Sequence, residues 1–113
     1  MQTRPRGPRA TRRDHGWIDE RSRALHTKIA EKLRAQPSLL SVAVENLDRW
    51  ERLRGRDGAV GEWRSLLDAP LPDLLRLLTE ESENAARLRQ SSPFAGILTE
   101  EERSAVFRHY ETL

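Results

Sequence analysis

The chain has 113 residues and no cysteine, and 36% of its residues are hydrophobic while 34% are charged. This length predicts one small domain with a modest core, and the lack of cysteine excludes a disulfide framework and a cysteine-based metal site. No run reaches the roughly 18 apolar residues that a membrane helix needs, and no apolar segment follows the basic N-terminus as it would in a secretory signal. We therefore expect a cytoplasmic protein without membrane contact.

The net charge of +2 hides an asymmetry along the chain. The first 13 residues contain no acid and five arginines, which are Arg4, Arg6, Arg9, Arg12 and Arg13. Without these five, the 20 basic residues fall to 15 against 18 acidic ones, so the rest of the chain has a net charge of −3. This composition predicts a disordered, arginine-rich tail at 1–14 and a helical domain at 15–113. The tail is either simply solvated or an arm for nucleic acid or an acidic partner.

Apolar residues recur at helical spacing, and no segment alternates apolar and polar residues over the length of a strand. Pro37 ends the first helical pattern, and Ser38 is expected to cap the second. The polar stretch after Leu78 leaves open whether the fourth pattern is one helix or two. The predicted fold is all-α, a single small bundle of five to six short helices at about 18–35, 39–53, 59–68, 72–90 and from 99 onward.

The least generic stretch, 88–98, joins the last two helical patterns. Pro93 disfavours helical backbone at the residue before it, so the preceding helix should end by about residue 90 or 91. Phe94, Ile97 and Leu98 place three apolar side chains in one turn. The stretch is therefore either a helix connection whose apolar residues fill the end of the bundle or a loop that contacts a partner.

The polar residues around this loop partly favour the interpretation that it contacts a partner. Arginine suits forked pairing with a carboxylate or phosphate, and two arginines precede the loop. Leu77 points away from the apolar stripe of its helix, so that helix is either central in the bundle or covered by a partner. The predicted partner-binding residues are Leu77, Arg87, Arg89, Gln90, Ser91, Ser92 and Phe94. A solvated helix end is the alternative.

The residue types that usually act in catalysis or metal binding form no known catalytic pattern in this chain. His15, His26 and His109 do not lie three or four residues apart, so we expect no metal site and no cofactor. The acidic run after Thr99 is explained by a helix start, because Thr99 and Glu102 have the spacing of a capping box. There is no nucleophile elbow, phosphate loop or dinucleotide fingerprint, and no enzyme activity is expected. The tryptophans are expected to anchor the core, although one partly exposed tryptophan could anchor a partner.

The run Leu88-Arg89-Gln90-Ser91-Ser92-Pro93-Phe94-Ala95-Gly96, followed by Leu98-Thr99 and Glu102-Arg103, is similar to a run in a family of small helical bacterial proteins. Earlier residues are similar too: Leu25-His26, Ile29-Ala30, Leu33-Arg34, Pro37-Ser38-Leu39-Leu40, Asn46-Leu47, Arg49-Trp50, Trp63, Leu66-Leu67, Pro70-Leu71 and Leu77-Leu78-Thr79-Glu80. On these residues, which cover about 20–110, the chain resembles antitoxins that are partnered with minimal nucleotidyltransferase toxins of the AbiEii type. Such toxins add nucleotides to the acceptor ends of transfer RNAs.

The resemblance implies that the chain binds and neutralises a co-encoded nucleotidyltransferase toxin. We expect residues 87–94 and the neighbouring helix to cover the active-site cleft of that toxin. The alternative is a small helical nucleic-acid-binding regulator that uses the arginine tail, and it predicts binding that falls steeply with salt and is lost when residues 1–13 are deleted. A purely structural subunit, which binds its partner without changing the partner's activity, is the third possibility.

Overall fold

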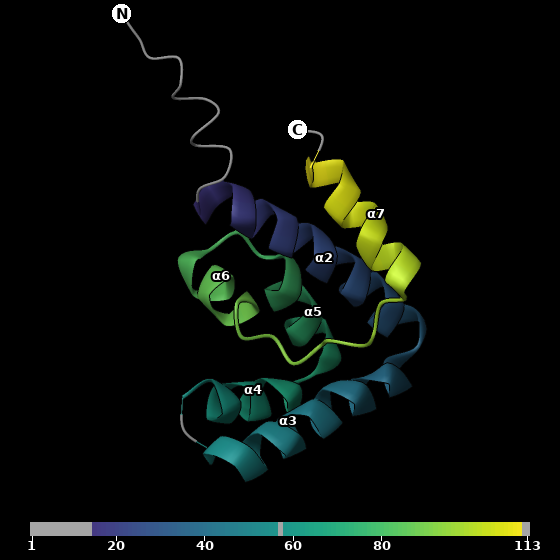
Figure 1. The fold of residues 1–113 in the computed structure, drawn as a ribbon. Coiled ribbons are helices and arrows are strands. Elements are labelled where there is room, and N and C mark those ends of the chain that lie inside the picture. The colour runs from purple at the N-terminus through teal and green to yellow at the C-terminus, as the bar shows by residue number, and fades with distance from the viewer. Residues whose placement is uncertain (1–14, 57, 112–113) are drawn as a thin grey trace, which may run out of the picture.

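The structure is a computed structural model that describes residues 15–56 and 58–111, and within these residues it is all-α (Figure 1). Six α-helices and one short 3₁₀ helix make up the described part, which confirms the predicted small helical bundle. The elements are α2 (His15–Ala35), η1 (Pro37–Leu39), α3 (Leu40–Arg54), α4 (Ala59–Leu67), α5 (Leu71–Thr79), α6 (Glu83–Arg89) and α7 (Glu100–Glu111). The predicted disordered tail lies outside the described residues.

Helix α2 is the centre of the arrangement. It packs against α5, α6, α7 and η1, while α3 and α4 form a helical hairpin that joins the bundle through η1 and α5 (Figure 1). The linker 90–99 runs across the bundle from α6 to α7. Within the described residues, no helix is long and apolar enough to cross a membrane.

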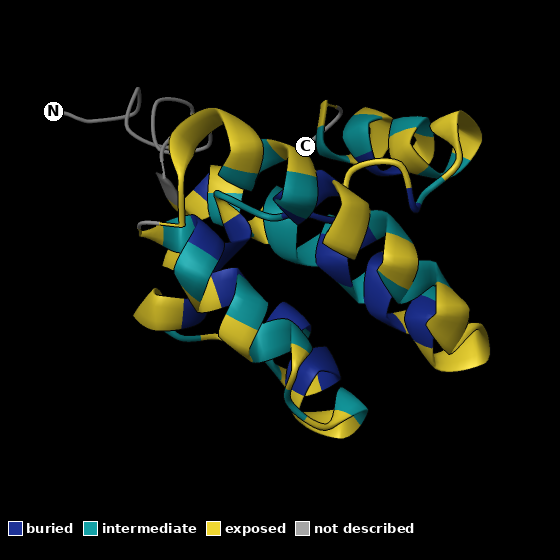
Figure 2. Cartoon of the chain, turned by 90° about the horizontal axis from the view of Figure 1, so that it is seen from below, coloured by how far each residue is buried: buried dark blue, intermediate teal, exposed yellow. Residues whose placement is uncertain are grey.

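The core is built from the faces that these helices turn toward one another (Figure 2). Its largest fully buried side chains include Leu33 of α2, Leu47 of α3 and Trp63 of α4. Burying one such side chain stabilises the fold by about 1.5 to 3 kcal/mol, so these helices are held by packing more than by their own propensity. Trp17 is also buried, whereas Trp50 is half-buried, so the expected core role is confirmed for Trp17 and Trp63.

The helix boundaries follow local chemistry, with one exception. Pro37 follows the end of α2 as predicted, but the prediction that Ser38 caps the second helix was wrong, because the N-cap position of α3 is Leu39 and no side chain caps it. The 72–90 stretch is two helices. Its second helix, α6, begins where the Ser82 hydroxyl accepts a hydrogen bond from the Ala85 amide at 3.1 Å.

Helix α7 begins with the predicted capping box. The Thr99 hydroxyl accepts a hydrogen bond from the Glu102 amide at 3.1 Å, and the Glu102 carboxylate accepts one from the Thr99 amide at 2.8 Å. This reciprocal pair satisfies two backbone donors that a helix start leaves open. The cap therefore fixes where the linker ends.

Candidate partner-binding surface

The linker is fixed to the bundle by its backbone. The buried Asn46 side chain of α3 donates its amide to the carbonyl oxygens of Pro93 at 2.7 Å and Ala95 at 3.0 Å. On the other side, the Lys32 ammonium donates to the Ile97 carbonyl at 2.9 Å. Because helices α2 and α3 supply these donors, the path of the linker is set by the scaffold, and residues beside it keep a defined position.

The apolar side chains of the linker belong to the core. Phe94 is 1% exposed, and its ring meets the rings of Trp63 and His26 edge to face, with centroids 5.4 and 6.3 Å apart. Such edge-to-face pairs are worth about 0.5 to 1.5 kcal/mol beyond their buried area. Gly96 has φ +98°, a backbone conformation that other residues adopt at a cost, and it turns the chain just after Phe94. This part of the linker fills the bundle, which is what the interpretation of the stretch as a helix connection predicted.

Four polar residues form the outer side of the linker and are here called the linker rim: Arg87, Gln90, Ser91 and Ser92. Arg87 and Gln90 are exposed, while the two serines are half-buried. The Ser91 hydroxyl accepts a hydrogen bond from the Trp63 indole at 3.4 Å, and the Ser92 hydroxyl accepts one from the Phe94 amide at 3.3 Å. The serines thus support the linker, whereas the two longer side chains face solvent.

Arg87 is held as a fork. Its two terminal nitrogens donate to the two carboxylate oxygens of Glu62 on α4, each at 2.9 Å, and it also bonds the Asn84 side chain. The hydrogen bonds from Arg87 lower the pKa of the Glu62 carboxyl and raise the pKa of the guanidinium. A carboxylate or phosphate of a partner would meet a guanidinium that is already oriented, with Glu62 as the group to displace.

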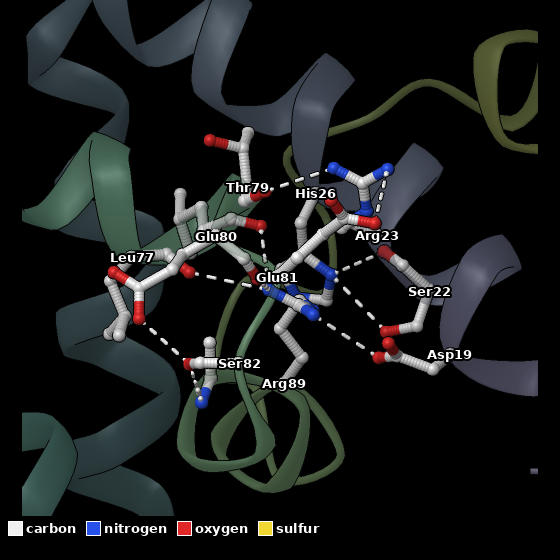
Figure 3. Close-up of polar contacts among 12 residues, drawn as sticks. Asp19, Ser22, Arg23, His26, Leu77, Thr79, Glu80, Glu81, Ser82 and Arg89 are labelled. Carbon is white, nitrogen blue, oxygen red and sulfur yellow. Dashed lines mark hydrogen bonds and ion pairs between the residues drawn. The ribbon is translucent and has the colours of Figure 1, made fainter. Parts of the chain in front are cut away.

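Arg89 has a different position, because residues two apart on a helix point about 160° away from each other. Its side chain is 1% exposed, and its guanidinium pairs with Asp19 at 3.2 Å (Figure 3). It also donates to carbonyl oxygens at the end of α5, which are those of Leu77, Leu78 and Glu80 at 3.4, 3.4 and 2.8 Å. Arg89 therefore joins α2, α5 and α6 from inside.

Two further residues of α2, the half-buried Arg23 and the buried His26, lie beside Arg89 (Figure 3). Arg23 of α2 donates to the Thr79 carbonyl at 3.1 Å and lies 3.6 Å from the Glu81 carboxylate. The Nδ1 atom of His26 lies 2.7 Å from the Ser22 carbonyl, and burial lowers the pKa of this histidine. The cluster has the properties of a structural joint between helices.

The predicted partner-binding residues thus divide into three groups. Arg87 and Gln90 are exposed, Leu77, Ser91 and Ser92 are half-buried, and Arg89 and Phe94 are inside the fold. Leu77 packs against the core cluster, so α5 is central in the bundle. Only the helix angle between the two arginines could have separated their roles from sequence. The predicted nucleic-acid-binding arginines of the tail lie outside the described residues.

In the described part, no group of three histidine, aspartate or glutamate side chains could hold a metal ion. The strongest ionic cluster joins α3 to α4, where Arg64 bonds Asp48 and Glu51, and Arg56 bonds Glu51 at 3.0 Å. Comparisons with family models, curated proteins and solved structures found no match to this chain.

Proposed function

We propose that this chain is a bacterial, cytoplasmic antitoxin that binds and neutralises a nucleotidyltransferase toxin acting on transfer RNA. One observation carries the proposal. Residues on which the family resemblance rests are far apart in sequence, yet they meet around the linker: Asn46 bonds it, and His26 and Trp63 pack on Phe94. The resembling residues therefore form one connected scaffold behind the linker rim, and this supports a binding role for the rim.

The rim suits a cleft that handles phosphates. The side chains of Arg87 and Gln90 are exposed, and the Arg87 fork, which Glu62 occupies in the free chain, matches the geometry of a carboxylate or phosphate group. A helical body behind a fixed rim can exclude nucleotide and transfer RNA from such a cleft without any chemistry of its own. In this proposal the chain is an inhibitor and has no enzyme activity or cofactor.

The first test is the identity of the partner. The tagged full chain is purified from its own host after nuclease treatment and a high-salt wash, and bound proteins are identified by mass spectrometry. We expect a nucleotidyltransferase in stoichiometric amount. When this partner is purified alone, it should transfer nucleotides to transfer RNA, and equimolar addition of the chain should abolish the transfer. Absence of a nucleotidyltransferase, or unchanged transfer activity, would contradict the proposal.

The second test concerns the rim. Arg87→Glu with Gln90→Ala should weaken the complex at least about tenfold, because it puts a carboxylate beside Glu62 and removes the exposed donors. Arg76→Glu is a matched control, since Arg76 is also exposed and also pairs with an acid, Asp73, at 3.2 Å. Equal affinities of the two variants would show that the rim is not the contact.

The arginine tail is the basis of a second candidate function. Its five positive charges stand before a body of net charge −3, and such a separation is typical of proteins with a nucleic-acid-binding arm. A regulator that binds nucleic acid through residues 1–13 is therefore the alternative proposal.

A further inference from the structure

The apolar stripe of α3 continues beyond the core that it packs against. Ala43 and Leu47 are buried, Trp50 is half-buried, and Leu53 at the end of the helix is 74% exposed. Leu53 is the most exposed of the large hydrophobic side chains in the described part of the chain. A single exposed leucine needs no explanation, but this one lies one turn after the half-buried Trp50, about 60° from it on the helix.

The end of α3 is held in place from its opposite side. Glu51 points about 160° away from Leu53 on the helix, toward α4, and it accepts hydrogen bonds from Arg64 at 2.9 and 3.1 Å. Gly55, with φ +81°, then ends the helix directly after this clamp. Leu53 is therefore presented by a fixed helix end.

Arginines outnumber acids among the described residues around Leu53. Arg49, Arg52 and Arg54 lie within about 100° of it on the helix and are all exposed, while Glu45 lies about 80° from it but two turns earlier. The guanidinium of Arg54 lies over the Trp50 ring, 5.8 Å from its centroid. Because Glu51 is turned away, these residues combine an apolar centre with a positive rim. Tryptophan and arginine are the residues most enriched where protein interfaces gain their affinity.

This surface is continuous with the linker. Asn46 lies within about 20° of Leu53 on the helix, two turns earlier, and its amide holds the Pro93 and Ala95 carbonyls. Arg49, between the two, donates a hydrogen bond to the Asn46 side-chain oxygen. Asn46, Arg49 and Leu53 thus mark a path along α3 from the linker to the helix end.

We propose that Arg49, Trp50 and Leu53, here called the α3 end face, dock into an apolar pocket rimmed by carboxylates on the protein partner. The positive rim selects an acidic partner surface, and the exposed leucine favours a protein over a nucleic acid, whose phosphate backbone offers no pocket for it. The inference rests on the proposed function, because the partner is the protein that the chain neutralises. It adds a second contact beyond the linker rim.

Photo-crosslinking of the full chain in its own host tests this surface. Leu53 is replaced by p-benzoylphenylalanine, which its exposure permits without disturbing the core. Val44 is the matched control position, because it is also an exposed apolar residue of α3 but points about 180° away. We expect one discrete protein adduct at position 53, at least about tenfold stronger than at position 44. Adding Arg49→Glu and Arg52→Glu should reduce it by a similar factor.

The outcomes of the crosslinking experiment distinguish failure of the α3 end face from failure of the proposed function. An adduct whose crosslinked peptide comes from a protein site with nearby acidic residues, and which is lost in the Arg49→Glu and Arg52→Glu chain, supports the α3 end face. No discrete adduct, an adduct removed by nuclease, an adduct with a second copy of the chain, or equal yields at both positions overturns it. A nucleotidyltransferase recovered by affinity purification without a crosslink at position 53 leaves the proposed function standing. A supported crosslink to a protein that is not a nucleotidyltransferase contradicts the proposed function alone.

Discussion

Arg89 places a positive charge in the interior of the bundle, next to the C-terminal end of α5. The last carbonyls of a helix carry partial negative charge and lack partners within the helix, and the Arg89 guanidinium bonds three carbonyls there. Arg89→Met retains much of the apolar stem but removes these donors. We expect the free energy of unfolding to fall by about 2 to 3 kcal/mol in urea titrations at pH 7.

The neighbouring exposed arginine supplies the control for this substitution. Arg87→Met breaks an ion pair whose two side chains are 55% and 44% exposed, and such solvent-screened pairs contribute little to stability. The two variants should therefore separate clearly in stability. Equal losses would mean that the α5 carbonyls find other donors when the Arg89 guanidinium is removed.

His26 makes stability depend on pH. Burial lowers its pKa, with the positive charge of Arg89 acting in the same direction and the Ser22 carbonyl and Asp19 acting against it. The unfolded chain therefore binds a proton at this site more readily than the folded chain below the ordinary histidine pKa of about 6.5. The contribution is fully present above that pH, and the free energy of unfolding should decrease as the pH falls from about 6.5 toward 5.

Chemical unfolding between pH 5 and 7.5 measures this slope, in a range above the lowered pKa values of Glu51, Glu62 and Glu102. His26→Gln should flatten the slope, and His109→Gln, at an exposed position, is the control for the loss of a histidine. A slope that survives in His26→Gln would assign the pH dependence to another group.

At the scale of elements, α7 is the helix with the fewest attachments. Among the described elements its main contact is α2, and Lys32 of that helix pairs with Glu102 at 2.9 Å. Hydrogen bonds from Thr99 and Lys32 lower the pKa of the Glu102 carboxyl, which also closes the capping box. Glu102→Ala should remove both attachments. We expect faster hydrogen exchange of the α7 amides, while the amides of α2 and α5 keep their protection.

Glu101→Ala is the matched control for α7. It removes a carboxylate from the same first turn, but its neighbour Glu102 keeps both the cap and the pair with Lys32. Its cost should stay near the few tenths of a kcal/mol expected from a charge at a helix start. Equal exchange rates in the two variants would show that α7 is held by its apolar contacts alone.

Sequence patterns predicted the elements well because helix signals are local. Pro37 and the Thr99–Glu102 capping box act on the backbone next to them. The end of α2 and the start of α7 could therefore be recognised in the sequence. Ser38 failed as a cap because the backbone there entered a 3₁₀ turn first. The division of 72–90 became clear only with the Ser82 cap and the extended Glu80 before it.

At the scale of the whole molecule, the positions of the site residues could not be read from the sequence, because they depend on contacts between distant helices. The helix angle separates Arg87 from Arg89, but the sequence does not show their partners: α4 supplies Glu62 to the first and α2 supplies Asp19 to the second. Phe94 became a core residue because Trp63 and His26 close around it. Leu53 belongs to the apolar pattern of its helix, yet it is 74% exposed, because no sequence signal marks where the packing of α3 ends.

The separation of charge between tail and body gives the last prediction. If the helical body binds the protein partner, deletion of residues 1–13 should change the affinity for that partner less than about threefold at 0.5 M salt, where exposed charges are screened. The full chain should bind DNA weakly, with the logarithm of affinity falling by about 4 per tenfold rise in salt, because five arginines can each neutralise a phosphate. Deletion should abolish this DNA binding. Loss of the protein partner on deletion would instead assign the function to the tail.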